Sequence, residues 1–397
     1  MPPNSVLLLT CAVGIVGSNS LVLGPIAAAM AATFEHASAA DVMVAGVVYG
    51  IFTALSALLL APQADRFGAA RTLCIALAVL MLALGLSALA DSVLWLAAAQ
   101  ALAGLAAGAA LPACYGLAVQ IAPAGQENRT LGVVLTGWTL CLVAGVSGSA
   151  LITEFAHWRV VFVLLAMLCA VVLAGIIRYR KADPAWRVPM VPGKAGSPWQ
   201  ALRVPGILPA LGVCAAFMIA FYGVYAYLGT HLVTVLGRST ASAGLATLCY
   251  GIGFGAAMLF DGLIDRHGRT TVAPWSFAVV GLAYALLALS ADRFAWLVAF
   301  CTLWGAVNHV GMNLVIGRLN ALDPSRRGAI LGLNSAVTYL AVFVGTLGFR
   351  PVFERGGLGA CAVLAVVCLV PVLADALWQR RSSRSTGRRD ERPAPSA

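Results

Sequence analysis

Long apolar stretches alternate with short polar or charged segments along the whole chain. A helix needs about 20 mostly apolar residues to cross a bilayer, so each stretch of that size predicts one membrane-spanning helix. Such stretches lie at residues 6–30, 42–63, 72–90, 93–121, 131–152, 160–177, 207–228, 241–263, 272–290, 294–316, 329–348 and 358–378. The pattern predicts an all-α membrane protein with twelve transmembrane helices, and the even number places both termini on one side of the membrane.

The composition agrees with a membrane protein. Of the 397 residues, 61% are hydrophobic and 10% are charged, which is too little charge to cover a soluble domain of this length. The net charge of +10 does not indicate nucleic acid as a partner, because Lys and Arg lie at the ends of apolar stretches. Only five of these 25 bases fall on one set of alternate loops: Arg159, Arg238, Arg293, Arg350 and Arg355. The positive-inside rule therefore predicts that both termini are cytoplasmic.

A charged turn occurs twice. Asp65-Arg66-Phe67-Gly68 follows the second apolar stretch, and Asp265-Arg266-His267-Gly268 follows the eighth, 200 residues later. The pairs Leu131-Gly132 and Leu331-Gly332 have the same spacing, which indicates a duplication running parallel along the chain. We expect two six-helix halves at 1–180 and 207–379, joined by a basic, Pro-rich cytoplasmic linker at 181–206. The tail at 380–397 lacks apolar periodicity and is predicted to be disordered.

Two parallel six-helix halves with this turn in each resemble the major facilitator superfamily of secondary transporters. Trp138, the segment His157-Trp158-Arg159-Val160-Val161-Phe162 and the segment Leu333-Asn334-Ser335-Ala336 are similar to the twelve-span drug:proton antiporter group, in its arabinose-efflux permease-like branch. The resemblance implies a monomeric secondary active transporter of the bacterial-type cytoplasmic (inner) membrane, with the lipid bilayer, a small-molecule substrate and protons as partners. It implies proton-coupled efflux of a small amphipathic or neutral solute, such as a drug, sugar or metabolite, by alternating access.

The chain departs from that group at three places. Gln100 stands four residues before Gly104, where the group has Arg. The fifth apolar stretch contains Gly145-Val146-Ser147-Gly148 without the Pro that the group carries there, and Ala61 replaces the Gly that opens its charged turn. An uncoupled facilitative carrier or an uptake permease therefore stays open as an alternative.

No segment has the residues of an enzyme site. The chain lacks a His-rich metal set, a Gly-x-Ser-x-Gly turn, a phosphate-binding Gly-x-x-x-x-Gly-Lys loop and paired carboxylates within an apolar stretch. All ten Cys lie within apolar stretches without the spacing of metal ligands or redox pairs. We predict a protein that is not an enzyme and binds no metal or cofactor. The alternative from a different class is a membrane-embedded solute sensor.

The charged turns predict a gate on the cytoplasmic face. Asp65 is expected near the first backbone amides of the eleventh span, at Gly328, because helix N-termini favour anions. The repeat predicts a matching contact of Asp265 with the start of the fifth span. Arg66 or Arg71 then reaches Glu127, and Arg266 or Arg269 reaches Asp323. The predicted gating residues are Asp65, Arg66, Gly68, Arg71, Glu127, Asp265, Arg266, Gly268, Arg269 and Asp323.

Amides, hydroxyls, one imidazole and aromatic rings with polar tips remain inside the apolar stretches. Burying such groups in hydrocarbon costs free energy unless they pair or line a wet cavity, so each either joins helices or faces a solute site. The aromatic members are Tyr49, Tyr115, Trp138, Tyr222, Tyr225, Tyr250 and Trp304. Parallel-repeat transporters bind solute between their halves. The predicted lining is Asn19, Tyr49, Tyr115, Trp138, Tyr222, Asn308, His309, Asn334 and Tyr339.

His309 is the first candidate for carrying a coupled proton. It lies near the middle of the tenth stretch, and its reference pKa of about 6.5 is close to working pH. His309 and Asn313 are four residues apart, hence on one helix face. Asp41, at the outer end of the second stretch, is the second candidate, with a helix-cap role as its alternative.

Overall fold

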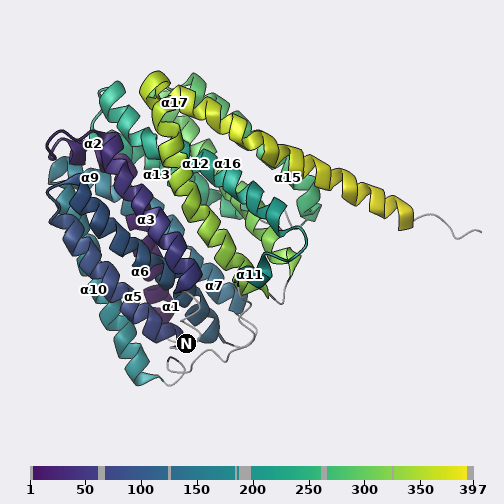
Figure 1. Ribbon diagram of the computed structural model, residues 1–397, viewed down its shortest axis with the longest axis horizontal. Coiled ribbons are helices and arrows are strands. Elements are labelled where there is room, and N and C mark those ends of the chain that lie inside the picture. Colours follow the sequence, from purple (N-terminus) through teal and green to yellow (C-terminus); the bar gives the residue numbers. More distant parts are fainter. Residues whose placement is uncertain are drawn as a thin grey trace, which may run out of the picture.

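The computed structural model describes residues 3–60, 68–123, 127–183, 186, 198–260, 266–323 and 326–390. All regular secondary structure within these residues is helical (Figure 1). Within these described ranges, ten helices are long and apolar enough to cross a membrane. Counting the bent pair formed by the first two helices, which meet at 46°, as one more crossing raises the number to eleven. The structure therefore confirms an all-α protein with many membrane-spanning helices, and the number twelve stays a prediction.

The helices before the predicted linker follow the apolar stretches closely. They are α1 (Pro3–Leu21), α2 (Leu23–Ala31), α3 (Ala39–Leu59), α5 (Ala69–Ala88), α6 (Val93–Gln120), α7 (Glu127–Leu135), α8 (Gly137–Leu140), the π-helix η1 (Cys141–Val146), α9 (Ser147–Phe155) and α10 (Trp158–Ala182). Helices α7 to α9 with η1 form one continuous crossing, Thr130–Phe155. Within it the Ser147 hydroxyl donates to the Leu142 carbonyl at 2.9 Å, which satisfies a backbone acceptor in the π-helical turn.

Helix α11 (Pro198–Ala201) lies within the predicted linker. After the linker come α12 (Ile207–Thr230), the π-helix η3 (His231–Val235), α13 (Thr240–Ala256), the 3-10 helix η4 (Ala257–Phe260), α15 (Arg269–Leu289), α16 (Phe294–Leu322) and α17 (Arg327–Asp390). Helix α17 contains the last two predicted spans, and Gly357 breaks it with φ 64° and ψ −163°. Figure 1 shows the chain reversing its course there. Helix α17 ends at Asp390, inside the stretch 380–397 for which the sequence predicts no regular structure.

Helix starts are fixed by local chemistry. Ser38 and Asp41 form a capping box at the start of α3. The Ser92 hydroxyl accepts from the backbone N–H of Trp95 at the start of α6. Helices α5 and α15 instead follow Gly68 and Gly268, whose φ values of 85° and 76° lie in the region that favours glycine. These two glycines end the repeated charged turns, so the repeat has the same backbone conformation at this point in both copies.

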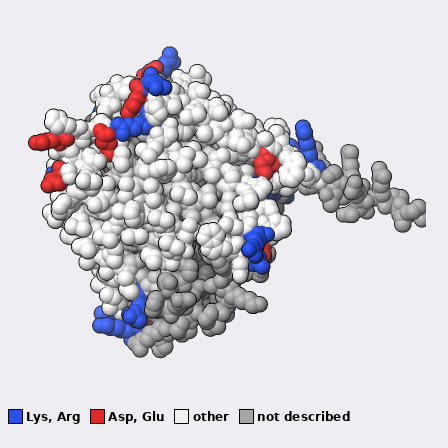
Figure 2. All heavy atoms as spheres, in the orientation of Figure 1, with Lys and Arg blue, Asp and Glu red and all other residues white. Residues whose placement is uncertain are grey.

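Small residues allow the helices to approach closely. A side chain at Gly104 or Gly108 of α6 would collide with the backbone of α3. Glycines also lie where helices from before and after the predicted linker meet. Gly229 of α12 packs against Gly24 and Pro25 of α2, and Gly244 of α13 packs against α9. Apolar side chains such as Val163, Met167 and Val171 of α10 are exposed. Figure 2 shows charged side chains near the ends of the helices and a largely uncharged band between them on that face.

We call the end of the bundle at which α3 begins, with the Asp41–Arg350 ion pair, the distal end. The opposite end, the proximal end, carries the N-terminus and α11 (Figure 1). The division into halves at 1–180 and 207–379 stays a prediction, as does the linker at 181–206.

Candidate functional site

A buried amide pair joins the first helices of the chain. The Asn19 Nδ2 group of α1 donates to Gln100 Oε1 of α6 at 3.0 Å, and Gln100 Nε2 donates to Asn19 Oδ1 at 3.3 Å. Gln100 Nε2 also lies 3.1 Å from the Ser87 hydroxyl of α5. All three side chains are buried. Gln100, noticed in the sequence only as a departure from a family pattern, is thus the centre of a neutral network that holds three helices together.

Two tyrosines from opposite sides of the predicted linker meet in the interior. The rings of Tyr49 on α3 and Tyr339 on α17 lie edge to face, with centroids 6.1 Å apart. Gly50 permits this approach, because a Cβ there would lie 2.8 Å from the Tyr339 carbonyl oxygen. Both rings are buried. Neither hydroxyl has a hydrogen-bond partner among the residues that the structure describes.

The hydroxyls of Ser20 on α1 and Tyr225 on α12 are in the same condition, buried and without a partner in the described part of the chain. We call these four groups, Ser20, Tyr49, Tyr225 and Tyr339, the hydroxyl set. Buried polar groups in proteins are nearly always paired with protein or water, so each exception needs an explanation. The set comes from α1, α3, α12 and α17, and so draws on helices from both sides of the predicted linker.

Aromatic rings gather beside this set. Phe221 of α12 packs against Tyr222, Tyr225, Tyr250 and Trp304 with centroid distances of 4.9, 5.2, 5.7 and 5.7 Å. Asn308 Nδ2 of α16 donates to the Tyr250 hydroxyl at 3.2 Å. Tyr222 and Asn308, both predicted to line a solute site, therefore belong to one aromatic cluster. Tyr250 and Trp304 also belong to it, although the sequence analysis noted their polar tips without including them in the predicted lining.

The imidazole of His309 lies one helical turn before Asn313. The Asn313 amide is 3.1 Å from His309 Nε2, as their spacing on one helix face predicts. The ring of Phe254 meets the imidazole edge to face at 4.8 Å. His309 is 8% exposed. His309 is thus buried between an amide and an aromatic ring. Apart from Tyr and Cys, it is the one titratable side chain that the sequence placed near the middle of a span.

The other predicted lining residues make contacts between helices. Trp138 Nε1 of α8 donates to the Tyr115 hydroxyl of α6 at 3.0 Å, and both side chains are half-buried. The Cys214 thiol of α12 lies 3.1 Å from Asn334 Oδ1 of α17. Together with the Asn19 network, these pairs have the helix-joining role that the sequence left as an alternative.

At the distal end an ion pair links α3 to α17. Arg350 donates to Asp41 Oδ1 at 3.0 Å and to Glu354 Oε1 at 2.8 Å. Asp41 Oδ2 accepts from the hydroxyl and the backbone N–H of Ser38 at 2.6 and 3.0 Å. Asp41 therefore caps α3, as its alternative role predicts, and also holds α17. From the sequence, Arg350 was assigned only to a loop, because a single sequence does not show which distant acidic residue an Arg will contact.

The predicted gate lies at the proximal end. Asp65, Arg66 and Asp265 fall outside the described residues, as does the side chain of Glu127. Arg71 and Arg266 are exposed. Arg269 donates to the Gly317 carbonyl of α16, and Asp323 forms a salt bridge with Arg326 at 3.6 Å. The predicted contacts of this gate stay predictions.

The sequence matches the Major Facilitator Superfamily over residues 8–346. The chain belongs to this superfamily of membrane transporters, which places it among proteins that move solutes across membranes rather than among enzymes. A curated relative is the uncharacterized MFS-type transporter YwfA of Bacillus subtilis (strain 168). It is 27% identical over 374 residues, which cover 92% of this chain and 90% of the relative. The superfamily resemblance is confirmed, and the antiporter branch stays a prediction.

Proposed function

We propose that this protein is a secondary active transporter that exports a small neutral or amphipathic solute by alternating access. The observation that carries the proposal is the hydroxyl set, which lies buried between helices from both sides of the predicted linker. A solute that donates or accepts hydrogen bonds would satisfy these groups. Parallel-repeat transporters bind their solutes at the interface of two repeats near the middle of the bilayer, and this location agrees with that rule.

The proposed topology has twelve crossings, with α1 and α2 forming one and α17 forming two around Gly357. The proximal end then faces the cytoplasm, because the positive-inside rule places the Arg-rich turns and both termini there. The membrane is the cytoplasmic one of a bacterial-type cell. The Asp41–Arg350 ion pair lies on the outer face in this topology and closes it, while the repeated charged turns act as the gate on the inner face.

The chemistry of the interior supports a weakly charged solute. The hydroxyl set and the aromatic cluster offer phenols, one amide and large ring faces, and none of their members is an Asp, Glu, Lys or Arg. Such a surface binds an amphipathic molecule through ring contacts and a few hydrogen bonds. A solute with a full charge would have no partner of opposite sign among these residues.

Proton coupling is proposed through His309 or Asp41. Protonation of His309 changes the charge within the membrane, and protonation of Asp41 removes the charge that holds Arg350 on the outer face. Both groups belong to helices that must move if access alternates. An uncoupled carrier or an uptake permease is the competing function, and a solute sensor is the candidate from a different class.

A flux experiment separates these functions. Purified protein is screened for thermal stabilisation by a panel of neutral and amphipathic compounds, because a binder of the folded state stabilises it by mass action. Each compound that binds is then loaded into proteoliposomes under an imposed pH gradient. Gradient-driven transport by the wild type supports the antiporter, transport that ignores the gradient supports the uncoupled carrier, and binding without flux supports the sensor.

Two variants identify the coupling group. His309→Ala is expected to retain binding but to lose the response to the gradient. Gradient-driven transport that persists in His309→Ala removes His309 from the mechanism and leaves Asp41→Asn as the next variant to measure.

A further inference from the structure

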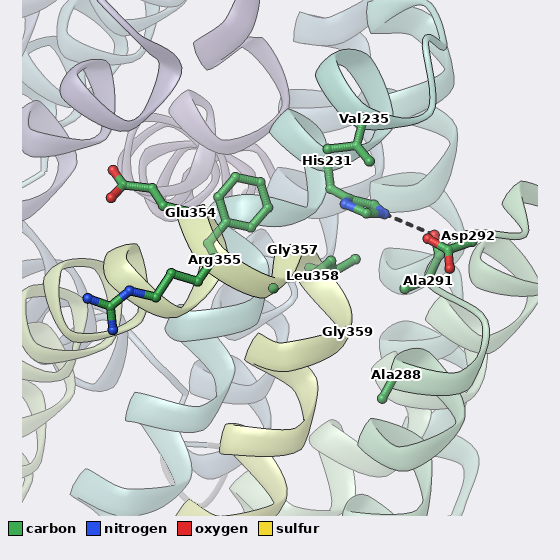
Figure 3. Close-up of a pocket in the computed structure, with 12 residues that line it drawn as sticks. His231, Val235, Ala288, Ala291, Asp292, Glu354, Arg355, Gly357, Leu358 and Gly359 are labelled. Atoms are coloured by element: carbon green, nitrogen blue, oxygen red, sulfur yellow. Dashed lines mark hydrogen bonds between the residues drawn. The ribbon is translucent and has the colours of Figure 1, made fainter.

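A cavity lies at the distal end, and its lining contains no member of the hydroxyl set (Figure 3). Its volume is about 470 Å³, within the range of roughly 300–1,000 Å³ that small-molecule sites occupy. The lining comes from η3, from the turn between α15 and α16, and from the break in α17. Its residues are His231, Val235, Ala288, Ala291, Asp292, Phe353, Glu354, Arg355, Gly356, Gly357, Leu358 and Gly359. All of them follow the predicted linker, and none belongs to the proposed transport site.

The buried group of this cavity is the imidazole of His231, which is 2% exposed. Its Nε2 atom lies 2.9 Å from the Ala291 carbonyl oxygen. A carbonyl only accepts hydrogen bonds, so Nε2 carries the hydrogen and Nδ1 of the neutral ring has a free lone pair. Nδ1 has no hydrogen-bond partner among the described residues. It lies close to the helix break, since a Cβ at Gly357 would be 3.8 Å from it.

The charge of the cavity is negative on the side of His231. Figure 3 shows the Asp292 side chain beside the His231–Ala291 hydrogen bond, while Glu354 and Arg355 extend to the opposite side of α17. Asp292 is exposed. No salt bridge of Asp292 occurs within the part of the chain that the structure describes. Glu354, by contrast, is paired with Arg350. The cavity therefore offers one carboxylate and one imidazole lone pair, both of which accept hydrogen bonds.

We propose that this cavity binds a small protonated primary amine on the distal face of the protein. One N–H of the ammonium group donates to His231 Nδ1, and another donates to the Asp292 carboxylate. A charge-assisted hydrogen bond to a carboxylate is stronger than a neutral one, so Asp292 supplies most of the selectivity. A metal ion fits less well, because the described residues contain no group of three or more His, Cys, Asp or Glu side chains placed to hold one.

The test measures binding of n-butylammonium to the purified full-length protein by saturation-transfer NMR. Saturable binding is expected for butylammonium, and none for tetramethylammonium, which has no N–H group, or for butyrate, which is an anion. Asp292→Asn is expected to weaken binding about tenfold or more, because a charged hydrogen bond becomes a neutral one. Since Asp292 is exposed, this variant keeps its fold. His231→Gln tests the buried acceptor separately and is expected to weaken binding less.

Asp91→Asn is the matched control, an exposed Asp in the turn between α5 and α6. It should leave binding of butylammonium unchanged. Tyr339→Phe, in the hydroxyl set, should leave it unchanged as well. Absence of saturable binding to the wild type overturns the proposal, and so does equal binding to the wild type and Asp292→Asn. A loss with Tyr339→Phe alone would assign the amine to the central site and would also overturn it.

Discussion

The polar contacts within the first helices differ from those that connect the first helices to the last. The Asn19–Gln100–Ser87 network is buried and mutually hydrogen-bonded, with both amide groups of the central pair satisfied. The Tyr49–Tyr339 contact between α3 and α17 is equally buried, yet both of its hydroxyls lack a partner in the described residues. The first contact joins helices through completed hydrogen bonds, whereas the hydroxyls of the second are available to the solute of the proposed function.

The largest effect on stability is expected from breaking the permanent network. Gln100→Ala leaves the amide of Asn19 buried without its partner and opens a small cavity, which should lower the free energy of unfolding by about 2 kcal/mol. The measurement is the thermal unfolding midpoint of the purified protein. Gln200→Ala, at an exposed position of α11, is the control and should have no effect. An unchanged midpoint in Gln100→Ala would mean that the network contributes nothing to the fold.

A smaller effect, confined to ligand binding, is expected at the contact between Tyr49 and Tyr339. Tyr339→Phe and Tyr49→Phe each remove a hydroxyl that forms no hydrogen bond with the described residues, so stability should stay within about 0.5 kcal/mol of the wild type. Affinity for a transported compound should fall by about 1 kcal/mol, or roughly fivefold. The matched control is Tyr179→Phe, whose ring stacks on Trp186 at 5.4 Å far along the chain from either tyrosine. Loss of stability without loss of affinity would mean that these two hydroxyls support the fold and do not bind the solute.

The smallest effect is expected at the ion pair of the distal end. The side chains of Asp41 and Arg350 are 38% and 32% exposed, so water screens their attraction, and the pair contributes at most about 1 kcal/mol. Asp41→Asn should therefore shift the population modestly towards states open at this end. The readout is the labelling rate of Ala150→Cys, on α9 where it faces Gly244 of α13, by a membrane-impermeant maleimide.

Glu354→Gln serves as the control for that experiment, because it leaves the Asp41–Arg350 pair in place. Equal labelling in Asp41→Asn and Glu354→Gln would show that this pair does not hold the distal end closed.

The apolar pattern predicted the long, regular helices well and the irregular ones poorly. The stretch 93–121 corresponds to α6 (Val93–Gln120), because every residue between the Ser92 cap and the end of α6 permits a membrane helix. The π-helices η1 and η3 were not predicted, since a single extra residue in a turn leaves the apolar pattern unchanged. The break at Gly357 lies between two apolar stretches that the sequence separated correctly, although its reversal of the chain follows from backbone angles.

The candidate site was predictable by residue type but not by partner. The sequence selected Tyr49 and Tyr339 because their polar tips lie in apolar stretches, yet only the packing at Gly50 shows that they meet. The sequence selected Asn19 for the same reason, but in the structure this side chain forms hydrogen bonds with Gln100. A cap role was an alternative for Asp41 because Asp41 lies at the end of an apolar stretch, whereas its partner Arg350 comes from a distant part of the chain. Interactions between residues close in the sequence, such as helix caps, can be predicted from the sequence. Contacts between residues hundreds of positions apart can be identified only once the fold is known.

The two carboxylate oxygens of Asp41 bind different partners: Oδ2 accepts a hydrogen bond from Ser38, and Oδ1 accepts one from Arg350. When Arg350 moves away, the bonds that begin α3 need not break. In the proposed transport cycle, the first turn of α3 can therefore move as a rigid body with the rest of its helix, and the distal end can open without local unfolding. Opening would then break the solvent-screened contact of Asp41 with Arg350 and the close packing of Gly229 and Gly244, and would leave the start of α3 intact.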